Sequence, residues 1–224
     1  MPRAALFDVD GTLTDTTYLH VHAWWEALRQ AGHKVPMAEV HRAVGLSGAD
    51  LLARVLGESR DPAGDETVDA AHKTLFATWH ERLAALEGAQ ELLRALHRRD
   101  WTIVLVTSAV GGELAALRRA LDADEVISHI ASASDVAEGK PAPDSVDQAR
   151  ERAGAAREQT VFLGDAVWDM RAASRAGVTA LGVLSGGIPR ADLEGAGAQE
   201  IYEGPADLLT RLEESAYARL ERES

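Results

Sequence analysis

The chain has 224 residues, of which 46% are hydrophobic and 26% charged, which is ordinary for a globular protein with a sizeable core. Its 36 acidic residues outnumber its 23 basic residues, and the formal net charge of −13 disfavours binding to nucleic acid or to an anionic membrane surface. The absence of cysteine excludes disulfides, thiol catalysis and thiolate metal sites. No signal-like segment or membrane-length apolar run stands out, so we expect a cytoplasmic protein.

The chain opens with a strand and continues into a long helical stretch. Residues 4–7 form a short, continuously apolar run. From about residue 16 to 83 the apolar spacing is helical and no convincing strand occurs. The helical patterns in this stretch lie at 21–32, 38–44, 49–56 and 68–83, with a loop at 61–66. We therefore predict an all-helical insertion after the first strand.

Strands and helices alternate through the rest of the chain. Clear strand-like runs lie at 101–106, 161–163 and 178–184, and weaker ones at 126–130 and 199–202. Helical patterns lie at 89–96, 114–121, 144–153 and 205–212, and the charged tail at 213–224 is expected to be a solvated helix. Asp144 is expected to be a helix N-cap and Pro205 a first helical residue.

These patterns predict an α/β fold with a Rossmann-like, doubly wound parallel sheet. Short and continuously apolar runs are typical of strands buried on both faces of such a sheet. Alternation of strand and helix implies parallel strands joined by right-handed crossovers. We expect an α/β core domain made of residues 1–15 and 84–224, interrupted by a helical domain at 16–83.

Polar side chains follow the predicted strands at their carboxyl ends or lie in the loops between them. They are Asp8, Asp10, Thr107, Ser108, Lys140, Asp165 and Asp169. Any one of these would be unremarkable in a turn or a helix cap. Ligands bind outside the carboxyl ends of the strands in open α/β sheets, so the set in this order predicts one site with carboxylates, hydroxyls and a lysine.

The same set resembles the motifs of the haloacid dehalogenase superfamily, from about residue 2 to 212. DVDGT at 8–12 resembles the first motif, Thr107 the second, Lys140 in GKPAPD the third, and GDAVWD at 164–169 the fourth. The helical insertion resembles the family's C1-type cap, and the overall pattern is similar to the phosphoglycolate phosphatase-like branch.

The resemblance implies roles for the first motif. Asp8 would be the nucleophile that attacks phosphorus and forms an aspartyl-phosphate. Asp10 would protonate the leaving alcohol and then activate water. Gly11 would let the backbone turn sharply and bring amides close to the phosphate.

The resemblance also implies a Mg²⁺ cofactor. A hard dication suits oxygen ligands and would reduce the repulsion between phosphate and ionised carboxylates. The implied ligands are the Asp8 carboxylate, the Asp10 backbone carbonyl and the Asp165 carboxylate, while Asp169 would hold the metal's waters or place Lys140.

Further positions are implied to bind the substrate. Thr107 would hydrogen-bond a phosphate oxygen with the Ser108 amide nearby, and Lys140 would add positive charge. The GLSG loop at 45–48 resembles the family's specificity loop, which makes Gly45 and Ser47 candidates for substrate contact, although a plain helix–helix turn is an equal alternative.

The implied activity is hydrolysis of a small phosphomonoester, such as phosphoglycolate or a sugar phosphate. The superfamily's true dehalogenases lack an acid where this chain has Asp10, so dehalogenation is disfavoured. A phosphomutase of the β-phosphoglucomutase type is the alternative. Such mutases carry an arginine in the cap loop, whereas GLSGAD has none and only Arg42 and Arg54 flank it.

Other interpretations receive less support. A non-catalytic binding protein would usually have lost the nucleophile, the lysine or the metal carboxylate. A histidine metal site is not expected, because His20 and His22 do not share a helix face. His20 remains a candidate for substrate contact, Trp24 and Trp25 are expected in the helical core, and Thr14 and Asp15 at a hinge. The expected partner is a small phosphorylated metabolite, and the oligomeric state is left open.

Overall fold

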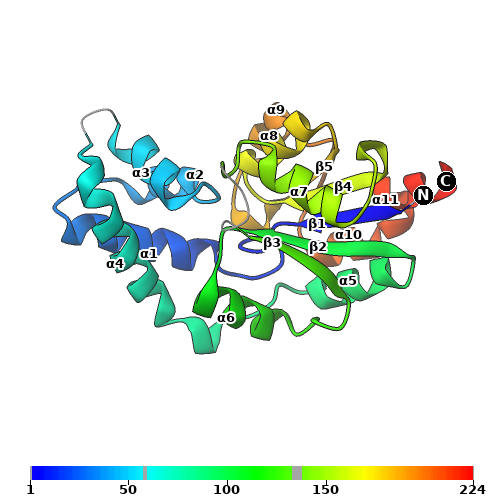
Figure 1. Ribbon diagram of the computed structural model, residues 1–224, viewed down its shortest axis with the longest axis horizontal. Coiled ribbons are helices and arrows are strands. Elements are labelled where there is room, and N and C mark those ends of the chain that lie inside the picture. Colours follow the sequence, from blue (N-terminus) through cyan, green and yellow to red (C-terminus); the bar gives the residue numbers. More distant parts are fainter. Residues whose placement is uncertain (1, 58–59, 133–137, 224) are drawn as a thin grey trace.

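The computed structural model describes residues 2–57, 60–132 and 138–223, which form a sheet flanked by helices and a group of helices at one end (Figure 1). The strands are β1 (Arg3–Phe7), β2 (Trp101–Thr107), β3 (Ile127–Ser132), β4 (Thr160–Gly164), β5 (Thr179–Val183) and β6 (Glu200–Tyr202). The helices are α1 (Thr17–Gln30), α2 (Met37–Ala43), α3 (Gly48–Leu56), α4 (Asp65–Ala77), α5 (Ala89–His97), α6 (Gly111–Leu121), α7 (Asp144–Arg152), α8 (Val167–Ala176), α9 (Arg190–Ala196), α10 (Pro205–Thr210) and α11 (Ala216–Glu223).

The described strands form one parallel sheet in the order β3-β2-β1-β4-β5-β6. β1 lies in the middle of the sheet. The chain adds β2 and β3 on one side of it and then β4, β5 and β6 on the other, as in a doubly wound sheet. The predicted fold class is therefore confirmed, and both weaker strand candidates are strands of this sheet.

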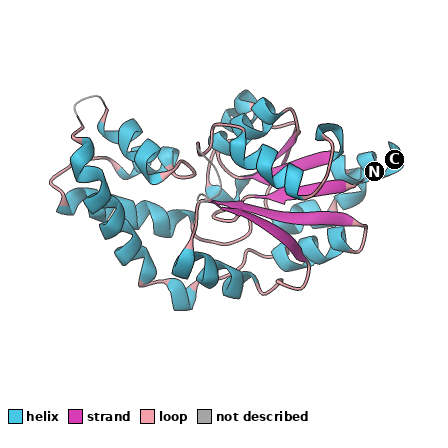
Figure 2. Ribbon diagram, viewed as in Figure 1, coloured by secondary structure: helices cyan, strands magenta, loops and turns pink. Residues whose placement is uncertain are grey.

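The central strand is buried on both faces. Ala5 and Phe7 belong to a hydrophobic cluster with α5, α10 and α11, whereas Ala4 and Leu6 belong to a cluster on the opposite face with α7 and α8. Helices flank the sheet on both faces (Figure 2). All four side chains are fully buried. Burial on both faces explains why this strand is apolar at every position from Ala4 to Phe7 and does not alternate with polar residues.

Helices α1–α4 form a layer of their own, called here the helical layer. Its hydrophobic cluster includes Val21, Trp24, Leu28 and Leu52. The layer lies beyond the carboxyl ends of the strands, because the strands run toward it from the end of the molecule that holds both termini (Figure 1).

The two connections between the helical layer and the sheet run side by side. The amide of Asp15 donates to the carbonyl of Ala84 at 3.0 Å, and the amide of Leu86 donates to the carbonyl of Leu13 at 2.9 Å. The Thr14 hydroxyl donates to the carbonyl of Val9 at 3.1 Å. Thr14 and Asp15, the residues expected at a hinge, thus lie where the two connections between the helical layer and the sheet run next to each other.

Two predicted helix boundaries were wrong. Helix α4 begins at Asp65, inside the predicted loop, and ends at Ala77, well before residue 83. Acidic residues in its first turn suit the positive end of the helix dipole, and a short 3₁₀ turn at Pro62–Gly64 leads into it. Asp144 is the first residue of α7 and its side chain makes no capping hydrogen bond, because Pro143 holds the cap position.

The C-terminal tail is helical, but it is not a solvated helix as predicted. Tyr217 of α11 is fully buried, and its ring packs edge-on against Trp101 with ring centres 5.0 Å apart. The Trp101 indole also donates to Glu221 at 2.8 Å. Helix α11 therefore closes one face of the sheet. In the described ranges no helix combines the length and apolarity needed to cross a membrane.

Candidate active site

Strand β1 delivers Asp8 to the edge of the sheet that faces the helical layer. The Asp8 amide donates to the Leu163 carbonyl of β4 at 2.9 Å, so the ends of both strands lie together. Asp165 follows β4 and approaches Asp8 for this reason. The Thr12 hydroxyl lies between the two carboxylates, 3.2 Å from Asp8 Oδ2 and 3.0 Å from Asp165 Oδ1.

Three carboxylates gather at this point around one lysine. Asp8, Asp165 and Asp169 each offer an oxygen within 4.8 Å of the others, and all three are buried. The Lys140 ammonium donates to Asp8 and, at 2.7 Å, to Asp169. The lysine side chain is itself buried, with 7% of its surface exposed. One cation therefore faces three closely spaced anionic groups.

The pKa values of these groups reflect the excess of buried carboxylates over the single lysine. Burial raises the pKa of Asp8 to about 7 despite the opposing effect of Lys140, and repulsion from Asp169 contributes. Burial and then the charges of Asp8 and Asp169 raise the pKa of Asp165 well above its usual range. Burial alone would lower the pKa of Lys140, but Asp169 and Asp8 raise it. A hard divalent cation fits this cluster, since it favours carboxylate oxygens and would hold them ionised.

The loop after β5 packs tightly against the cluster. A Cβ atom at Gly186 would lie 1.7 Å from Asp165 Oδ2, and the Ser185 hydroxyl donates to the Gly11 carbonyl at 2.6 Å. Gly11 has a positive φ of 80°, and a Cβ there would lie 2.4 Å from Asp165 Oδ2. Sequence reasoning missed Ser185 and Gly186, whose only signal was a Ser-Gly-Gly stretch after a predicted strand.

Asp10 lies apart from the three carboxylates and has its own partners. Its Oδ1 accepts from the Thr16 hydroxyl at 2.6 Å and lies 3.2 Å from His20 Nε2. Burial would raise the pKa of Asp10, but His20 and Thr16 outweigh burial and lower it. Conversely, burial would lower the pKa of His20, but Asp10 and Glu113 raise it. His20, the candidate for substrate contact, therefore holds Asp10.

A second histidine supports His20 from behind. His72 Nε2 lies 3.1 Å from His20 Nδ1, and the His72 ring stacks on Trp24 with ring centres 4.0 Å apart. Burial lowers the pKa of His72 to about 2, so this ring is neutral. Sequence reasoning missed His72, although its spacing from Val68 and Phe76 on the buried face of α4 was a signal. Trp24 packs in the core of the helical layer, as predicted.

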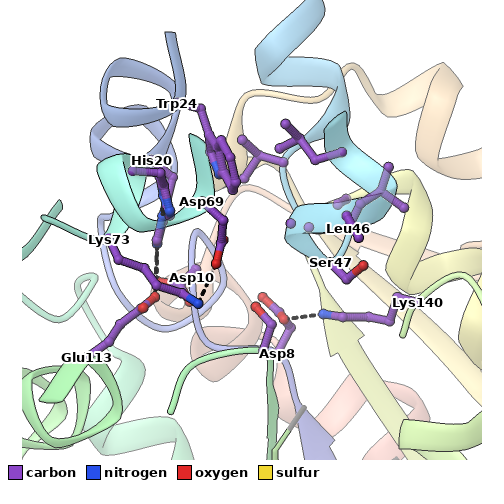
Figure 3. A pocket seen from close by; sticks show the side chains of 18 of the residues that line it. Asp8, Asp10, His20, Trp24, Leu46, Ser47, Asp69, Lys73, Glu113 and Lys140 are labelled. Carbon is purple, nitrogen blue, oxygen red and sulfur yellow. Dashed lines mark hydrogen bonds and ion pairs between the residues drawn. The ribbon is translucent and has the colours of Figure 1, made fainter. Parts of the chain in front are cut away.

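A cavity of about 420 Å³ separates the sheet from the helical layer (Figure 3). Of the residues singled out in the sequence, it is lined by Asp8, Asp10, His20, Gly45, Ser47, Ser108, Lys140 and Asp165. Thr107 lies beside Ser108 and Lys140 in a small adjoining hollow, and its hydroxyl accepts from the Ala109 amide at 3.0 Å. Gly11 and Asp169 do not line the cavity themselves. Gly11 packs against Asp165, and Asp169 accepts a hydrogen bond from Lys140. Except for Thr107, Gly11 and Asp169, the expected site residues line one cavity.

The helical layer also touches the sheet domain at a second place, around Trp168 of α8. The Trp168 indole donates to the Arg42 carbonyl at 3.1 Å, and the Arg54 guanidinium carbon lies 4.8 Å from the ring centre. Gly45 lies so close that a Cβ there would be 3.1 Å from the Ala166 side chain and 3.3 Å from Trp168. Trp168 belongs to the GDAVWD motif, so this contact joins the loop at 45–48 to the carboxylate cluster.

Replacing Trp168 by alanine is expected to raise KM and lower kcat/KM about tenfold. It removes one hydrogen bond and a cation–π contact, together worth about 1.5 kcal/mol, that hold the helical layer over the cavity. Steady-state kinetics would check this, with Trp25→Ala as the control, since Trp25 stacks on Arg29 within the helical layer. Unchanged kinetics in a folded Trp168→Ala protein would show that this contact does not hold the helical layer over the cavity.

Comparisons with known proteins agree with this geometry. The family model described as haloacid dehalogenase-like hydrolase matches residues 2–177. A protein of Dickeya dadantii named probable phosphatase IndB is 31% identical, with 83% of each chain covered. A phosphoglycolate phosphatase of Pseudomonas fluorescens is 28% identical over 83% of this chain and 71% of its own.

Among solved structures, a hydrolase from Pseudomonas syringae is similar along almost its whole length. It is 37% identical, covers 96% of this chain and 99% of its own, and superimposes with a TM-score of 0.91. The family match extends from the start of β1 to the end of α8 and includes all four strand-end motifs. This chain belongs to the haloacid dehalogenase-like hydrolase family.

Proposed function

We propose that the chain is a Mg²⁺-dependent phosphatase that hydrolyses a small phosphomonoester through an aspartyl-phosphate at Asp8. The observation that carries this proposal is the Asp8 carboxylate at the floor of the cavity, next to the Lys140 ammonium and Asp165. The phosphatase names of the relatives from Dickeya dadantii and Pseudomonas fluorescens support the same class of reaction.

In the first step Asp8 attacks phosphorus, and the bond between phosphorus and the leaving oxygen breaks. Asp10 delivers a proton to that oxygen, which leaves as an alcohol. The lowered pKa of Asp10 leaves this carboxyl ionised, so the proton that it delivers comes from His20, whose raised pKa keeps a proton 3.2 Å away, and the proton taken from water in the second step restores it. Lys140 offsets negative charge on the transferring phosphoryl group.

In the second step water attacks the aspartyl-phosphate. Asp10 takes a proton from this water, and inorganic phosphate leaves with Asp8 regenerated. The lowered pKa of Asp10 suits a base. When bound, Mg²⁺ would neutralise charge on the phosphate, held by the carboxylates of Asp8 and Asp165 and the Asp10 carbonyl, with Asp169 behind them.

Residues around the floor would bind the phosphate and the rest of the substrate. Thr107, Ser108 and the backbone at Gly11 are proposed to contact phosphate oxygens. We further propose that residues 16–83 act as a cap over the core formed by 1–15 and 84–224, and that Gly45 and Ser47 face the leaving group from it. The cavity lining supports the placement of Ser47 and Ser108.

A phosphomutase would need a cation to hold a second phosphate group. No arginine lines the cavity within the described ranges, and Arg54 instead lies over the Trp168 ring. Lys73 is already paired with Asp69. The mutase alternative therefore has no feature of the cavity in its favour.

Removing divalent metal is expected to reduce phosphate release at least about 100-fold, because three buried carboxylates would otherwise repel the phosphate. Release of inorganic phosphate from a panel of phosphomonoesters would be measured with Mg²⁺, with EDTA, and after Mg²⁺ is restored. Asp8→Asn protein purified in parallel controls for contaminating phosphatases. Release that persists in EDTA would refute the metal-dependent mechanism, and a requirement for a bisphosphate would favour the mutase.

A further inference from the structure

The cavity extends beyond the catalytic floor, and its outer walls carry carboxyl groups. Asp69 projects into it from α4 of the helical layer, and Glu113 from α6 of the sheet domain (Figure 3). Both lie on the side of Asp10, away from Lys140 (Figure 3). The proposed role of Asp10 as the acid that protonates the leaving oxygen places the leaving group on this same side. A leaving group would therefore meet acceptors of hydrogen bonds on two walls.

The lysine contributed to the lining by the helical layer is already paired. Lys73 lies one turn from Asp69 on α4, with 2.5 Å between its Nζ and Asp69 Oδ2. Asp69 is also in close contact with the start of α3, because a Cβ at Gly48 would lie 2.7 Å from Asp69 Oδ1. The pair compensates part of the charge of both partners, so Lys73 attracts a substrate carboxylate less than an unpaired lysine would, and Asp69→Asn would free it to do so.

The charge of the lining is negative overall. The carboxyl groups in it are Asp8, Asp10, Asp69, Glu113 and Asp165. Against them the described lining has two lysines, Lys73 and Lys140, and His20. Lys73 pairs with Asp69, and His20 Nε2 lies 3.2 Å from Asp10 and 3.8 Å from Glu113, so five carboxyl groups face three cationic groups. A divalent cation would compensate charge at the floor, where the phosphate adds two negative charges of its own. A second anionic group on the substrate would meet like charge in a partly desolvated space.

The volume of the cavity and the apolar residues in its wall favour a leaving group larger than two carbons. The cavity of about 420 Å³ lies within the range that accommodates ligands much larger than glycolate. Trp24, Val44, Leu46 and Leu51 supply apolar surface above the floor. Carbon-bound hydrogens of a ring or chain would pack on this surface while hydroxyls reach the acidic walls.

We propose that the leaving group is an uncharged polyhydroxylated alcohol of sugar-like size, and that Asp69 and Glu113 select it over phosphomonoesters that carry a carboxylate. This inference rests on the proposed phosphatase activity and narrows its substrate class. Ionised carboxylates accept strong hydrogen bonds from hydroxyl groups, so the same groups that repel an anion bind a polyol. Phosphoglycolate is accordingly a poor substrate.

Matched substrate pairs test the inference, because each pair differs only by a hydroxymethyl group in place of a carboxylate. The pairs are 2-hydroxyethyl phosphate with phosphoglycolate, and glucose 1-phosphate with glucuronic acid 1-phosphate. The full chain with Mg²⁺ is expected to give a kcat/KM at least about tenfold higher for the uncharged member of each pair. The glucose pair is expected to be turned over faster than the two-carbon pair.

A charge-removing variant then assigns the preference to Asp69. In Asp69→Asn the preference for the uncharged member is expected to shrink about tenfold, because one repulsive charge is lost and Lys73 is released to bind the carboxylate. Glu66→Gln is the matched control, since Glu66 is an exposed acid on the same helix outside the cavity. Its preference is expected to equal that of the unmodified chain.

The outcomes separate the two proposals. Metal-dependent hydrolysis that is equal or faster for the carboxylate members would overturn the inference and leave the phosphatase standing. An unchanged preference in Asp69→Asn would overturn the role of Asp69. Faster turnover of the two-carbon pair would overturn the sugar-like size. No hydrolysis of any of the four compounds by protein that releases phosphate from another member of the phosphomonoester panel would also overturn the inference, whereas no release from any member of the panel would count against the phosphatase itself.

Discussion

Replacing Asp8 by asparagine is expected to abolish phosphate release, with kcat at least about 10⁴-fold lower. The amide is nearly isosteric but cannot form the covalent bond to phosphorus. The variant is also expected to remain folded, and without metal its melting temperature should equal or exceed that of the unmodified chain. Burial already disfavours the charged form of Asp8, and the change removes one of three crowded anions.

Kinetics and thermal unfolding of the same preparation check both parts of this expectation. Asp192→Asn is a matched control, because Asp192 is exposed on α9 outside the cavity lining and its loss should leave kcat unchanged. Turnover by Asp8→Asn near the unmodified rate would remove Asp8 from the chemistry. Loss of activity together with unfolding would make the variant uninformative about catalysis, which is why the melting temperature is measured alongside.

Replacing Lys140 by methionine is expected to lower both activity and stability. The change leaves Asp8 and Asp169 buried without the cation that donates to them. Breaking a buried pair by removing one partner costs about 3–5 kcal/mol, so a fall in melting temperature of about 10 °C is expected. Loss of the positive charge beside the transferring phosphoryl group should reduce kcat/KM about 10³-fold.

Calorimetry and phosphate-release kinetics would measure these two effects. Lys34→Met is the control, because Lys34 is exposed to solvent and lies outside the cavity lining. Saturating Mg²⁺ should recover part of the lost stability by neutralising the cluster in place of the ammonium group. A Lys140→Met protein with unchanged stability and activity would contradict the account of the cluster.

Most of the sheet could be predicted from the sequence because its strands are buried on both faces. The runs at 4–7 and 161–163 are apolar at every position, the run at 101–106 is apolar except at Thr102, and each lies within a strand. Helix ends were harder, since several residues near them suit both a loop and a first helical turn. Asp65 is an example, because an acid stabilises a helix start as readily as it favours a turn.

The site was predictable to the extent that its residues follow strand ends. Asp8 and Asp165 were singled out on this ground and Lys140 as a lysine in a loop between strands, and all three line the same cavity. His72 and Glu113 were not, because they come from helices that approach Asp10 and His20 only after the fold is complete. Tyr217 was missed for the same reason, since its burial depends on the pairing of α11 with Trp101.

The most direct test of the central claim is to trap the phosphorylated enzyme. The Asp10→Asn variant would be mixed with Mg²⁺ and p-nitrophenyl phosphate, whose leaving group needs no protonation, and quenched in acid. It should accumulate the intermediate, because water is no longer activated in the second step. Borohydride reduction and peptide mass spectrometry would then locate the modified residue. The account predicts conversion of Asp8 to homoserine, and none in Asp8→Asn protein. Substrate turnover with no modification at Asp8 would contradict it.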